Sequence, residues 1–405
     1  MHSSPKMYSR IRSLHIVFGL DNNLGGVPHT AVSVARYLTE AGHPADVLAT
    51  HAPEDDVAYL AREYGNVKVH LIPRTFPKRF WNSAGLVPWM EANLHAYDIV
   101  EIHAVWSPLY FHATRCCARL GKPYLMRPQS SLDPFDLRKH SLAKRLLGPC
   151  VVRPMIAGAA GLIFSARMEA ERVVTYGVAK KSYFVPLAVT KVPPELSRLG
   201  REDFRRRHRI PLDAPVVVFL SRIDPKKGLE FLVPALADLR GRFPRLHFLL
   251  VGSGESRYLR QIQELIAAHG LRDCTTETGF LSGADKLSAL ASADIFALPS
   301  LNENFGMVIV EAMREGLPVV ISDEVYIHHE VTDGQTGVVC QPGMASCRDA
   351  LAGLLADGAD SRAEMGARGR RLAETVFSPE AATEKLLDVY RDILSAREVD
   401  AVAGG

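Results

Sequence analysis

Two basic side chains follow the most strand-like segment of the sequence. Residues 215–221 form an apolar run, and Arg222 and Lys227 come directly after it, before Gly228. At the carboxyl end of a strand, the planar fork of an arginine and the mobile charge of a lysine can clamp a diphosphate. The alternative is a solvated basic loop that holds no ligand.

Two carboxylates lie further along the chain, at Glu303 and Glu311. Gly306 between them is predicted to open a helix, whose first N–H groups have no partner within the helix. One carboxylate could accept hydrogen bonds from the hydroxyls of a ribose, and the other from a second sugar. The alternative is two exposed surface glutamates, but apolar neighbours such as Phe305 and Ile309 predict that this unit is wedged into the edge of a sheet.

The first half of the chain offers two weaker candidates. Gly25 and Gly26 lie between a predicted strand and a predicted helix, where backbone N–H groups can approach an anion. A tight turn without a ligand is an equally good interpretation, and the spacing lacks the full nicotinamide-cofactor fingerprint. His103 ends a predicted strand, 99–103, where a functional histidine and a structural hydrogen-bonding histidine both remain open.

The elements that must position these residues alternate along the chain. Short apolar runs predict strands, and amphipathic stretches between them predict helices, among them 166–176 in the first half. This alternation predicts an α/β fold of two doubly wound, Rossmann-like parallel-sheet domains. The predicted parts are residues 1–195, 196–378, and a C-terminal helix and tail, 379–405, that crosses back to the first domain. Ligands of such sheets bind outside the carboxyl ends of the strands, so we expect the site in a cleft between the domains.

The predicted strands are 14–19, 45–50, 67–72, 99–103, 123–126 and 161–165 in the first domain, and 215–221, 247–251, 275–279, 295–298, 318–322 and 337–340 in the second.

The composition is that of a globular protein with two domains. The chain has 405 residues, 47% of them hydrophobic, and a formal net charge of only +3, which argues against a protein that coats nucleic acid. Its six cysteines show no metal-ligand spacing and are predicted to be buried free thiols. No apolar leader precedes the first strand, and no segment reaches the ~20 apolar residues of a membrane span. We therefore expect a cytoplasmic protein.

The small net charge conceals a basic segment. Between His112 and Arg153 there are nine lysines and arginines, among them Lys139, Lys144 and Arg145, against two aspartates. Leucines are interleaved with these cations. The segment is either a solvated helix face or a surface that docks on anionic lipid or on a pyrophosphate-linked acceptor.

The two motifs of the second half, Arg222 with Lys227 and Glu303 with Glu311, resemble a known family in their order and in their separation of about 80 residues. The family is that of the retaining nucleotide-sugar glycosyltransferases of group one, family four, which have the GT-B fold and are related to glycogen synthase. The segment 98–108 resembles the one that carries the family's active-site histidine, and Ser165 with Glu169 matches a recurrent pair. Residues 132–136 resemble the exopolysaccharide and lipopolysaccharide branch. The resemblance covers nearly the whole chain.

The resemblance implies a role for each candidate. Arg222 and Lys227 would neutralise the leaving diphosphate, Glu311 would bind the nucleotide ribose, and Glu303 would hold the transferred sugar. His103 would contact that sugar near its anomeric carbon. The remaining donor-binding residues would be Gly25, Gly26, Phe280, Asn304, Phe305, Gly306 and Met307. The activity implied is transfer of a hexose to a saccharide or polyprenyl-linked acceptor in the synthesis of cell-surface polysaccharides and glycoconjugates, without a metal ion or another cofactor and without nucleic acid. The enzyme would be cytoplasmic, with peripheral contact to the inner face of the membrane.

Two departures from the family pattern concern the acceptor. The family's Asn-Gly after the interdomain proline is here replaced by residues 187–189, and its Pro-Arg-Gly segment reads Pro128, Gln129, Ser130. We hypothesise that Arg127 supplies the missing positive charge to the acceptor. Two other functions stay open, namely a GT-B epimerase or hydrolase of the same donor and a non-catalytic subunit that binds sugar nucleotides. Analysis of the reaction products separates them.

Overall fold

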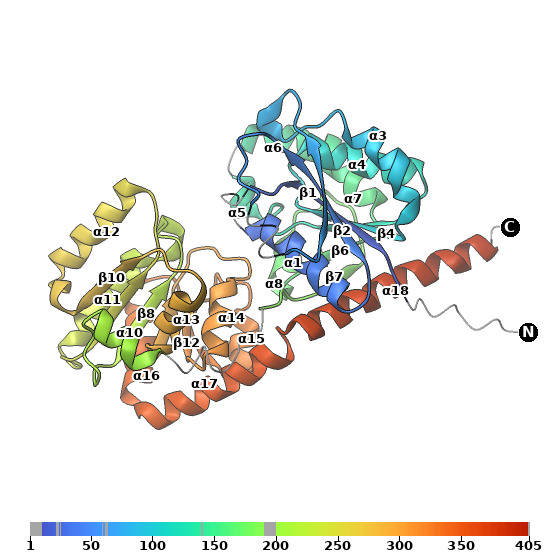
Figure 1. Cartoon of the computed structure of the whole chain (residues 1–405). Coiled ribbons are helices and arrows are strands. Elements are labelled where there is room, and N and C mark those ends of the chain that lie inside the picture. Colours follow the sequence, from blue (N-terminus) through green and yellow to red (C-terminus); the bar gives the residue numbers. More distant parts are fainter. Residues whose placement is uncertain are drawn as a thin grey trace, which may run out of the picture. The chain divides into compact units, whose positions relative to one another are not determined.

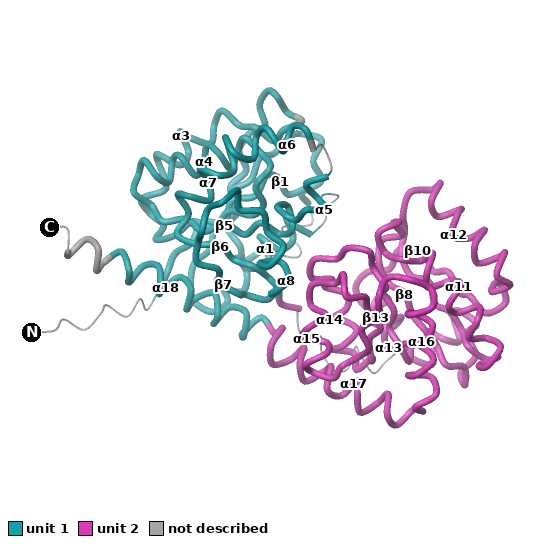
Figure 2. Tube along the Cα trace, turned by 180° about the vertical axis from the view of Figure 1, so that it is seen from behind, with its two compact units in different colours: residues 1–187, 379–405 teal, residues 188–378 magenta. Residues whose placement is uncertain are grey.

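The computed structural model describes residues 10–21, 24, 26–58, 60, 64–138, 141–189 and 200–403, in two compact units (Figures 1 and 2). Unit 1 comprises Met1–Leu187 and Pro379–Gly405, and unit 2 comprises Ala188–Ser378. The division therefore falls before the predicted boundary at residue 195. The reason is a backbone contact, because the N–H of Val189 already donates to the carbonyl of Phe377 within unit 2, at 2.9 Å.

Unit 1 is built on a seven-stranded sheet in the order β3-β2-β1-β4-β5-β6-β7, and all neighbouring strands pair in parallel. Strands β1, β4, β5 and β6 are almost completely buried, as expected of a parallel sheet covered on both faces. The strands are β1 Ser13–Gly19, β2 Ala45–His51, β3 Lys68–Pro73, β4 Ile99–His103, β5 Tyr124–Arg127, β6 Gly161–Phe164 and β7 Ser182–Phe184.

The helices of unit 1 mostly follow the apolar spacing of the sequence. The exception is the helix predicted over 166–176, which ends at Arg172, because Val173 turns to an extended conformation and the N–H of Val174 donates to the carbonyl of Leu132. The helices are α1 Gly26–Glu40, η2 Lys78–Phe80, α3 Leu86–Asn93, η3 Leu94–Ala96, α4 Pro108–Arg119, α5 Pro134–Leu137, α6 Ser141–Leu147, η4 Gly148–Val152, α7 Arg153–Gly158 and α8 Arg167–Arg172.

Unit 2 has a six-stranded parallel sheet in the order β10-β9-β8-β11-β12-β13. Its strands are β8 Val216–Leu220, β9 His247–Val251, β10 Thr275–Gly279, β11 Ile295–Leu298, β12 Val319–Ser322 and β13 Gly337–Cys340. Its helices are α10 Arg201–Arg207, η5 Pro225–Lys227, α11 Leu229–Arg240, α12 Ser256–Ala268, η6 Arg272–Cys274, α13 Gly283–Ala291, α14 Met307–Arg314, α15 His328–Asp333, α16 Met344–Ala356 and α17 Gly358–Thr375.

The strand order reverses once in each sheet, between β1 and β4 in unit 1 and between β8 and β11 in unit 2. Such a reversal opens a crevice at the carboxyl ends of the two strands, where ligands of doubly wound sheets bind. His103 is the last residue of β4, Gly26 begins the helix after β1, and Arg222 and Glu303 lie on the loops that leave β8 and β11. The topology therefore brings the predicted residues of each unit to that unit's own switch point.

The last helix, α18 Pro379–Ala403, belongs to unit 1 although it follows unit 2 in sequence (Figure 2). Its apolar face completes one of the two cores of unit 1, against α1 and the first strands. The residues that do so are Leu386, Leu387, Val389, Tyr390, Ile393 and Leu394.

Among the described residues, no helix is both long enough and apolar enough to cross a membrane. Five of the six cysteines are buried free thiols, whereas Cys150 in η4 is exposed, contrary to the prediction that all six are buried.

Candidate active site

The loop after β8 is shaped by two residues that fix its turn. The side chain of Asp224 accepts a hydrogen bond from the N–H of Lys226, at 3.0 Å, and so caps the single turn η5. Gly228 follows in the left-handed region, with φ of 74°, and a Cβ there would lie 2.0 Å from the carbonyl oxygen of Pro299. Only glycine permits this approach, which brings the β8 loop against the loop that follows β11.

The contact between these loops joins the two predicted motifs. Lys227 and Glu303, which are 76 positions apart in sequence, form an ion pair between Nζ and Oε2. Lys227 is buried, and Glu303 is held by its own backbone, which bonds to the carbonyl of Glu324 and to the N–H of Tyr326. One cation and one carboxylate from the two motifs therefore share a single site.

The other two charged residues of the motifs have different surroundings. Arg222 is exposed and makes no ion pair with any residue that the structure describes. Glu311 on α14 pairs with Lys286 of α13, at 2.7 Å between Oε1 and Nζ. No local pattern pointed to Lys286, because its partner Glu311 lies 25 positions away on a different helix.

The start of α14 is open to a ligand. Gly306 precedes the helix with φ of 66°, no side chain caps the first turn, and Met307 is exposed. Unsatisfied N–H groups at such an end favour an anion. Asn304 is half-buried on the same loop, and Phe305 is buried, as its apolar neighbours predicted, so the donor contact predicted for this segment stays a prediction about its backbone. The ring of Phe305 is 2% exposed and packs edge-to-face on Phe377, so only its backbone can contact a ligand.

Two glycines after β9, which were not predicted, bring that segment close to the loop that carries Arg222. A Cβ on Gly252 would lie 1.9 Å from the carbonyl oxygen of Ser221, and one on Gly254 would lie 2.0 Å from that of Ile223. These glycines let the backbone after β9 lie against the loop that carries Arg222. The signal was present, because Gly-Ser-Gly follows the apolar run of β9 directly. Phe280, at the end of β10, is 73% exposed.

In unit 1, Gly26 is the first residue of α1 and is exposed. A Cβ there would have no heavy atom within 4 Å, so the packing of the protein itself does not require a glycine. Close approach of a ligand to this backbone would require one. Gly25 lies outside the described residues.

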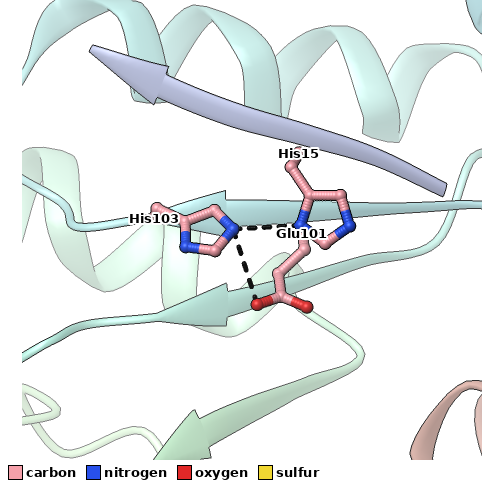
Figure 3. A group of neighbouring side chains, drawn as sticks. All are labelled: His15, Glu101 and His103. Atoms are coloured by element: carbon pink, nitrogen blue, oxygen red, sulfur yellow. Dashed lines mark hydrogen bonds and ion pairs between the residues drawn. The ribbon is translucent and has the colours of Figure 1, made fainter. Parts of the chain in front are cut away.

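His103 ends β4, as predicted, but its ring is enclosed in a buried network with His15 and Glu101 (Figure 3). Its Nε2 lies 3.1 Å from Nδ1 of His15 and 3.6 Å from Oε1 of Glu101. Its Nδ1 faces Nε2 of Gln129 at 3.1 Å. Because the ring has no exposed surface, the predicted contact between His103 and the donor sugar is wrong for this conformation.

The carboxylate of Glu101 also explains why Arg127 is buried. The predicted role of Arg127 at the acceptor is therefore also wrong for this conformation. Arg127 is 1% exposed, and its Nε donates to Oε1 of Glu101 at 2.6 Å, while Nη1 donates to the carbonyl of Val185. The other oxygen of Glu101 accepts the hydroxyl of Tyr390, at 2.8 Å. Arg127 therefore neutralises a buried carboxylate instead of meeting a ligand at the surface.

The positions of His15, Glu101 and His103 would also suit a metal ion, since their ligand atoms lie within 4.8 Å of one another. Their contacts argue for a hydrogen-bonded network instead. The two ring nitrogens already share one hydrogen bond, and the nearest carboxylate oxygen is held by Arg127. An ion would have to displace that guanidinium, so the donor set does not fit a metal site without rearrangement.

Strained backbone surrounds this network. Ala104, Gln129 and Ser130 all have positive φ, at 77°, 50° and 61°, which costs non-glycine residues energy. The buried carboxylate of Glu169 helps to hold this backbone, because it accepts the N–H of Ser130 at 2.8 Å. Its other oxygen accepts the N–H and the hydroxyl of Ser165. Burial raises the pKa of Glu169.

Of the predicted acceptor and membrane residues, Lys144 and Arg145 lie on α6, the former half-buried and the latter exposed. Lys139 lies outside the described residues.

Comparison with known proteins identifies the family. The family described as "Glycosyl transferases group 1" matches residues 200–372, and "Glycosyltransferase Family 4" matches residues 24–190. The chain belongs to this family. The glycosyltransferase is 40% identical to a phosphatidyl-myo-inositol mannosyltransferase of Mycolicibacterium smegmatis over 344 residues, or 82% of each chain.

Other relatives differ in what their names say they transfer. A D-inositol 3-phosphate glycosyltransferase of Xylanimonas cellulosilytica is 32% identical over 320 residues, which are 74% of this chain and 73% of that one. An alpha-D-kanosaminyltransferase of Streptomyces kanamyceticus is 34% identical over 194 residues, which are about half of each protein. Among solved structures, Anabaena HepE in complex with UDP superimposes with a TM-score of 0.76 at 18% identity, over 95% of this chain and all of that one. That likeness shows the fold.

The buried histidines predict how the stability of the glycosyltransferase depends on pH. Burial, helped by the charge of Arg127, lowers the pKa of His103 to about 3 and that of His15 to about 4, although Glu101 acts in the opposite direction. Between pH 6.5 and about 4 the unfolded chain therefore binds protons that the folded chain does not. The unfolding free energy of unit 1 should fall as the pH falls, by about 1.4 kcal/mol per pH unit for each ring.

Urea unfolding at pH 7, 6, 5 and 4.5 measures this slope. In the double variant His15→Asn with His103→Gln, the unfolding free energy should depend less steeply on pH, by up to the contribution of both rings. This holds whatever the stability of the variant at pH 7. Equal slopes for the variant and the unchanged protein would show that these rings are not neutral in the folded state.

Proposed function

We propose that the glycosyltransferase moves a hexose from a nucleoside diphosphate sugar to a saccharide or lipid-linked acceptor, with retention of configuration at the anomeric carbon. The ion pair between Lys227 and Glu303 carries the proposal. It supports a single donor site made from the two motifs, in which a cation for the diphosphate lies beside a carboxylate for the sugar.

The charges of the site suit the departure of a diphosphate. Cleavage of a glycosyl phosphate leaves an anion and a centre with oxocarbenium character, so fixed positive charge on the leaving group is the main electrostatic contribution. Arg222 has no ion-pair partner among the described residues and is free to meet the diphosphate. Lys227 and the start of α14 add to it. This set of donors supports transfer without a divalent metal.

Lys227 must change partners when the donor binds. Its ammonium is paired with Glu303 in the structure, and a diphosphate in reach of the same ammonium would compete for it. Release of Glu303 would then free its carboxylate to accept hydrogen bonds from sugar hydroxyls. Glu311, with Lys286 beside it, is proposed to bind the ribose in the same way.

The acceptor class is supported by the relatives' names, which include phosphatidyl-myo-inositol and D-inositol 3-phosphate. We propose a polar acceptor that carries a phosphate, in the synthesis of cell-surface glycoconjugates. A position on the inner face of a membrane, held by peripheral contacts, would bring the enzyme to such an acceptor.

Thermal unfolding in the presence of UDP-, GDP-, ADP- and dTDP-sugars tests the donor. A ligand at 100 times its dissociation constant stabilises by about 2.7 kcal/mol, which should raise Tm by about 5 °C or more. We expect one base to stand out, and the increase to persist in a metal chelator. If no nucleotide sugar raises Tm, the proposal is wrong.

The products of the preferred donor decide the reaction. Transfer with retention should give a glycoside whose anomeric proton has the donor's configuration in NMR spectra. An epimerised donor with no acceptor product would identify an epimerase, and inversion would overturn the proposed stereochemistry. Binding of the donor without turnover, whichever acceptor is added, would identify a non-catalytic subunit.

A further inference from the structure

Two cysteines of unit 2 meet at the end of its sheet. Cys340 is the last residue of β13, and Cys347 lies near the start of α16. Their thiols share a hydrogen bond. Cys340 is 5% exposed, and Cys347 is completely buried. The donor site uses neither thiol, so the pair is free for another role.

The turn between the two cysteines keeps them together. The N–H of Gln341 donates to Oγ of Ser346 at 3.0 Å, and the N–H of Cys347 donates to the carbonyl of Gly343 at 3.1 Å. Both bonds fold the start of α16 back onto the end of β13. A disulfide requires that its two cysteines lie within reach of each other before they are oxidised, and this turn holds them there.

The shared hydrogen bond makes the two thiols chemically unequal. It lowers the pKa of Cys340, although burial and the carboxylate of Asp323 act in the opposite direction. The same bond, together with burial, raises the pKa of Cys347. Because the thiolate is the form that attacks an oxidant, Cys340 is the nucleophile of the pair. Cys347 is then the thiol that can attack the oxidised sulfur.

The nucleophile lies directly before a turn at the surface. Gln341 is exposed, and a Cβ on Gly343 would have no heavy atom within 4 Å. A small oxidant can therefore approach Cys340 through the turn, whereas a bulky disulfide reagent is excluded by the burial of the sulfur.

We propose that Cys340 and Cys347 form an oxidation site, which closes to a disulfide when the protein meets a peroxide. The thiolate of Cys340 displaces hydroxide from hydrogen peroxide and becomes a sulfenic acid. The sulfur of Cys347 attacks that sulfenic sulfur, the S–S bond forms, and the S–OH oxygen leaves as water with the proton of Cys347. Two thiols are thus oxidised to one disulfide, and one peroxide is reduced to two molecules of water.

The bond would also act on the donor site, a consequence that rests on the proposed function. The carbonyl of Cys340 accepts the N–H of Asp323 at 2.9 Å, and the carbonyl of the next residue, Glu324, accepts the N–H of Glu303 at 3.1 Å. Closing a covalent bond draws the two sulfurs closer than a thiol contact does, so the end of β13 must move. We expect this movement to disturb Glu303. Loss of one such hydrogen bond would weaken donor binding about fivefold.

Mass spectrometry of the full chain tests the disulfide. Both cysteines lie in one tryptic peptide, residues 315–348, because no lysine or arginine lies between Arg314 and Arg348. The protein is treated with hydrogen peroxide, then unfolded, alkylated and digested. We expect this peptide to lose the mass of two hydrogen atoms and to take up no alkylating reagent, and dithiothreitol to restore both thiols. A peptide that keeps two alkylated thiols, or that gains oxygen instead, overturns the proposal.

The chain contains a matched control pair. Cys116 and Cys117 on α4 are also buried, but adjacent residues of a helix point to different sides, and burial raises the pKa of Cys117. Both should remain alkylatable after the same treatment. Equal oxidation of the two pairs would show that the contact between Cys340 and Cys347 confers no reactivity, which contradicts the proposal. In the variant Cys347→Ser, Cys340 should gain oxygen, because the second sulfur is missing.

Thermal unfolding with the preferred nucleotide sugar tests the link to the donor site. At 100 times the dissociation constant, a fivefold weaker donor loses about a third of its stabilisation. The donor-induced rise in Tm should shrink by this fraction in the oxidised protein and recover in dithiothreitol. An unchanged rise in a protein that carries the disulfide would refute the link to Glu303. Absence of any rise in the reduced protein would instead refute the proposed function and leave the disulfide standing.

Discussion

Replacing Lys227 with alanine is expected to lower the rate of nucleoside diphosphate release from the preferred donor by about 10²–10³-fold. Lys227 is the buried cation that joins the two motifs, and its charge is fixed before the leaving group forms. In the proposed mechanism that charge would stabilise the departing diphosphate more than the bound donor, so most of the loss should appear in kcat. Steady-state kinetics with the donor identified by thermal unfolding measures the change.

Lys226→Ala is the matched control, since it removes the same kind of side chain from the same turn. The backbone carbonyl of residue 226, which accepts the N–H of Leu301, is retained in this variant. The loop after β8 should therefore keep its shape. We expect the control to stay within about threefold of the unchanged enzyme. If Lys227→Ala behaves like this control, Lys227 is not part of the transfer machinery. A far-UV circular dichroism spectrum checks that both variants are folded.

Glu101→Gln should destabilise unit 1 by about 3–5 kcal/mol. The substitution keeps the shape of the side chain but removes the negative charge that Arg127 faces inside the core. Burial alone would raise the pKa of Glu101, but Arg127 and the two histidines outweigh it and lower the pKa to about 2, so the carboxylate is charged at neutral pH. The buried guanidinium would be left without a counter-charge. Urea unfolding, followed by circular dichroism, measures the loss.

The chain offers an exposed counterpart to this buried pair. Asp392 on α18 pairs with Lys181 at 2.7 Å, with both side chains about half exposed, so Asp392→Asn should change stability little. The double variant Glu101→Leu with Arg127→Met should recover much of the stability lost by Glu101→Gln, because it leaves no unpaired charge. A small effect of Glu101→Gln would mean that Arg127 finds another partner.

Most strands and helices could be predicted because the spacing of their apolar residues is that of a strand, or that of a helix, along the whole element. Strand β7, Ser182–Phe184, was missed because it is short and only partly buried, at the edge of its sheet. Helix α17 was missed because its glycines and charged residues leave little apolar pattern. Its close packing on the turn that follows α14 shows at Gly366, where a Cβ would lie 1.8 Å from the carbonyl oxygen of Gly316.

The donor motifs were readable because each lies next to a strand end, and the ends of neighbouring parallel strands meet. Arg127 and His103 were misjudged for a related reason. Both occupy strand ends, and the register pairs them directly. The sequence does not reveal that Glu101 and the distant Tyr390 close over them. Whether a polar residue at a strand end is buried depends on such long-range partners, which cannot be predicted from the residues next to it in sequence.

The position of α18 sets an order in which the two units can fold. Unit 2 is one continuous stretch of chain, so it can complete its fold without the residues that follow Ser378. Unit 1 precedes it in sequence but lacks the apolar face of α18 and the hydroxyl of Tyr390 until the residues after Ser378 are present. A released chain truncated after residue 378 should therefore resist protease in unit 2 while unit 1 remains cleavable, the reverse of the usual N-terminal-first order.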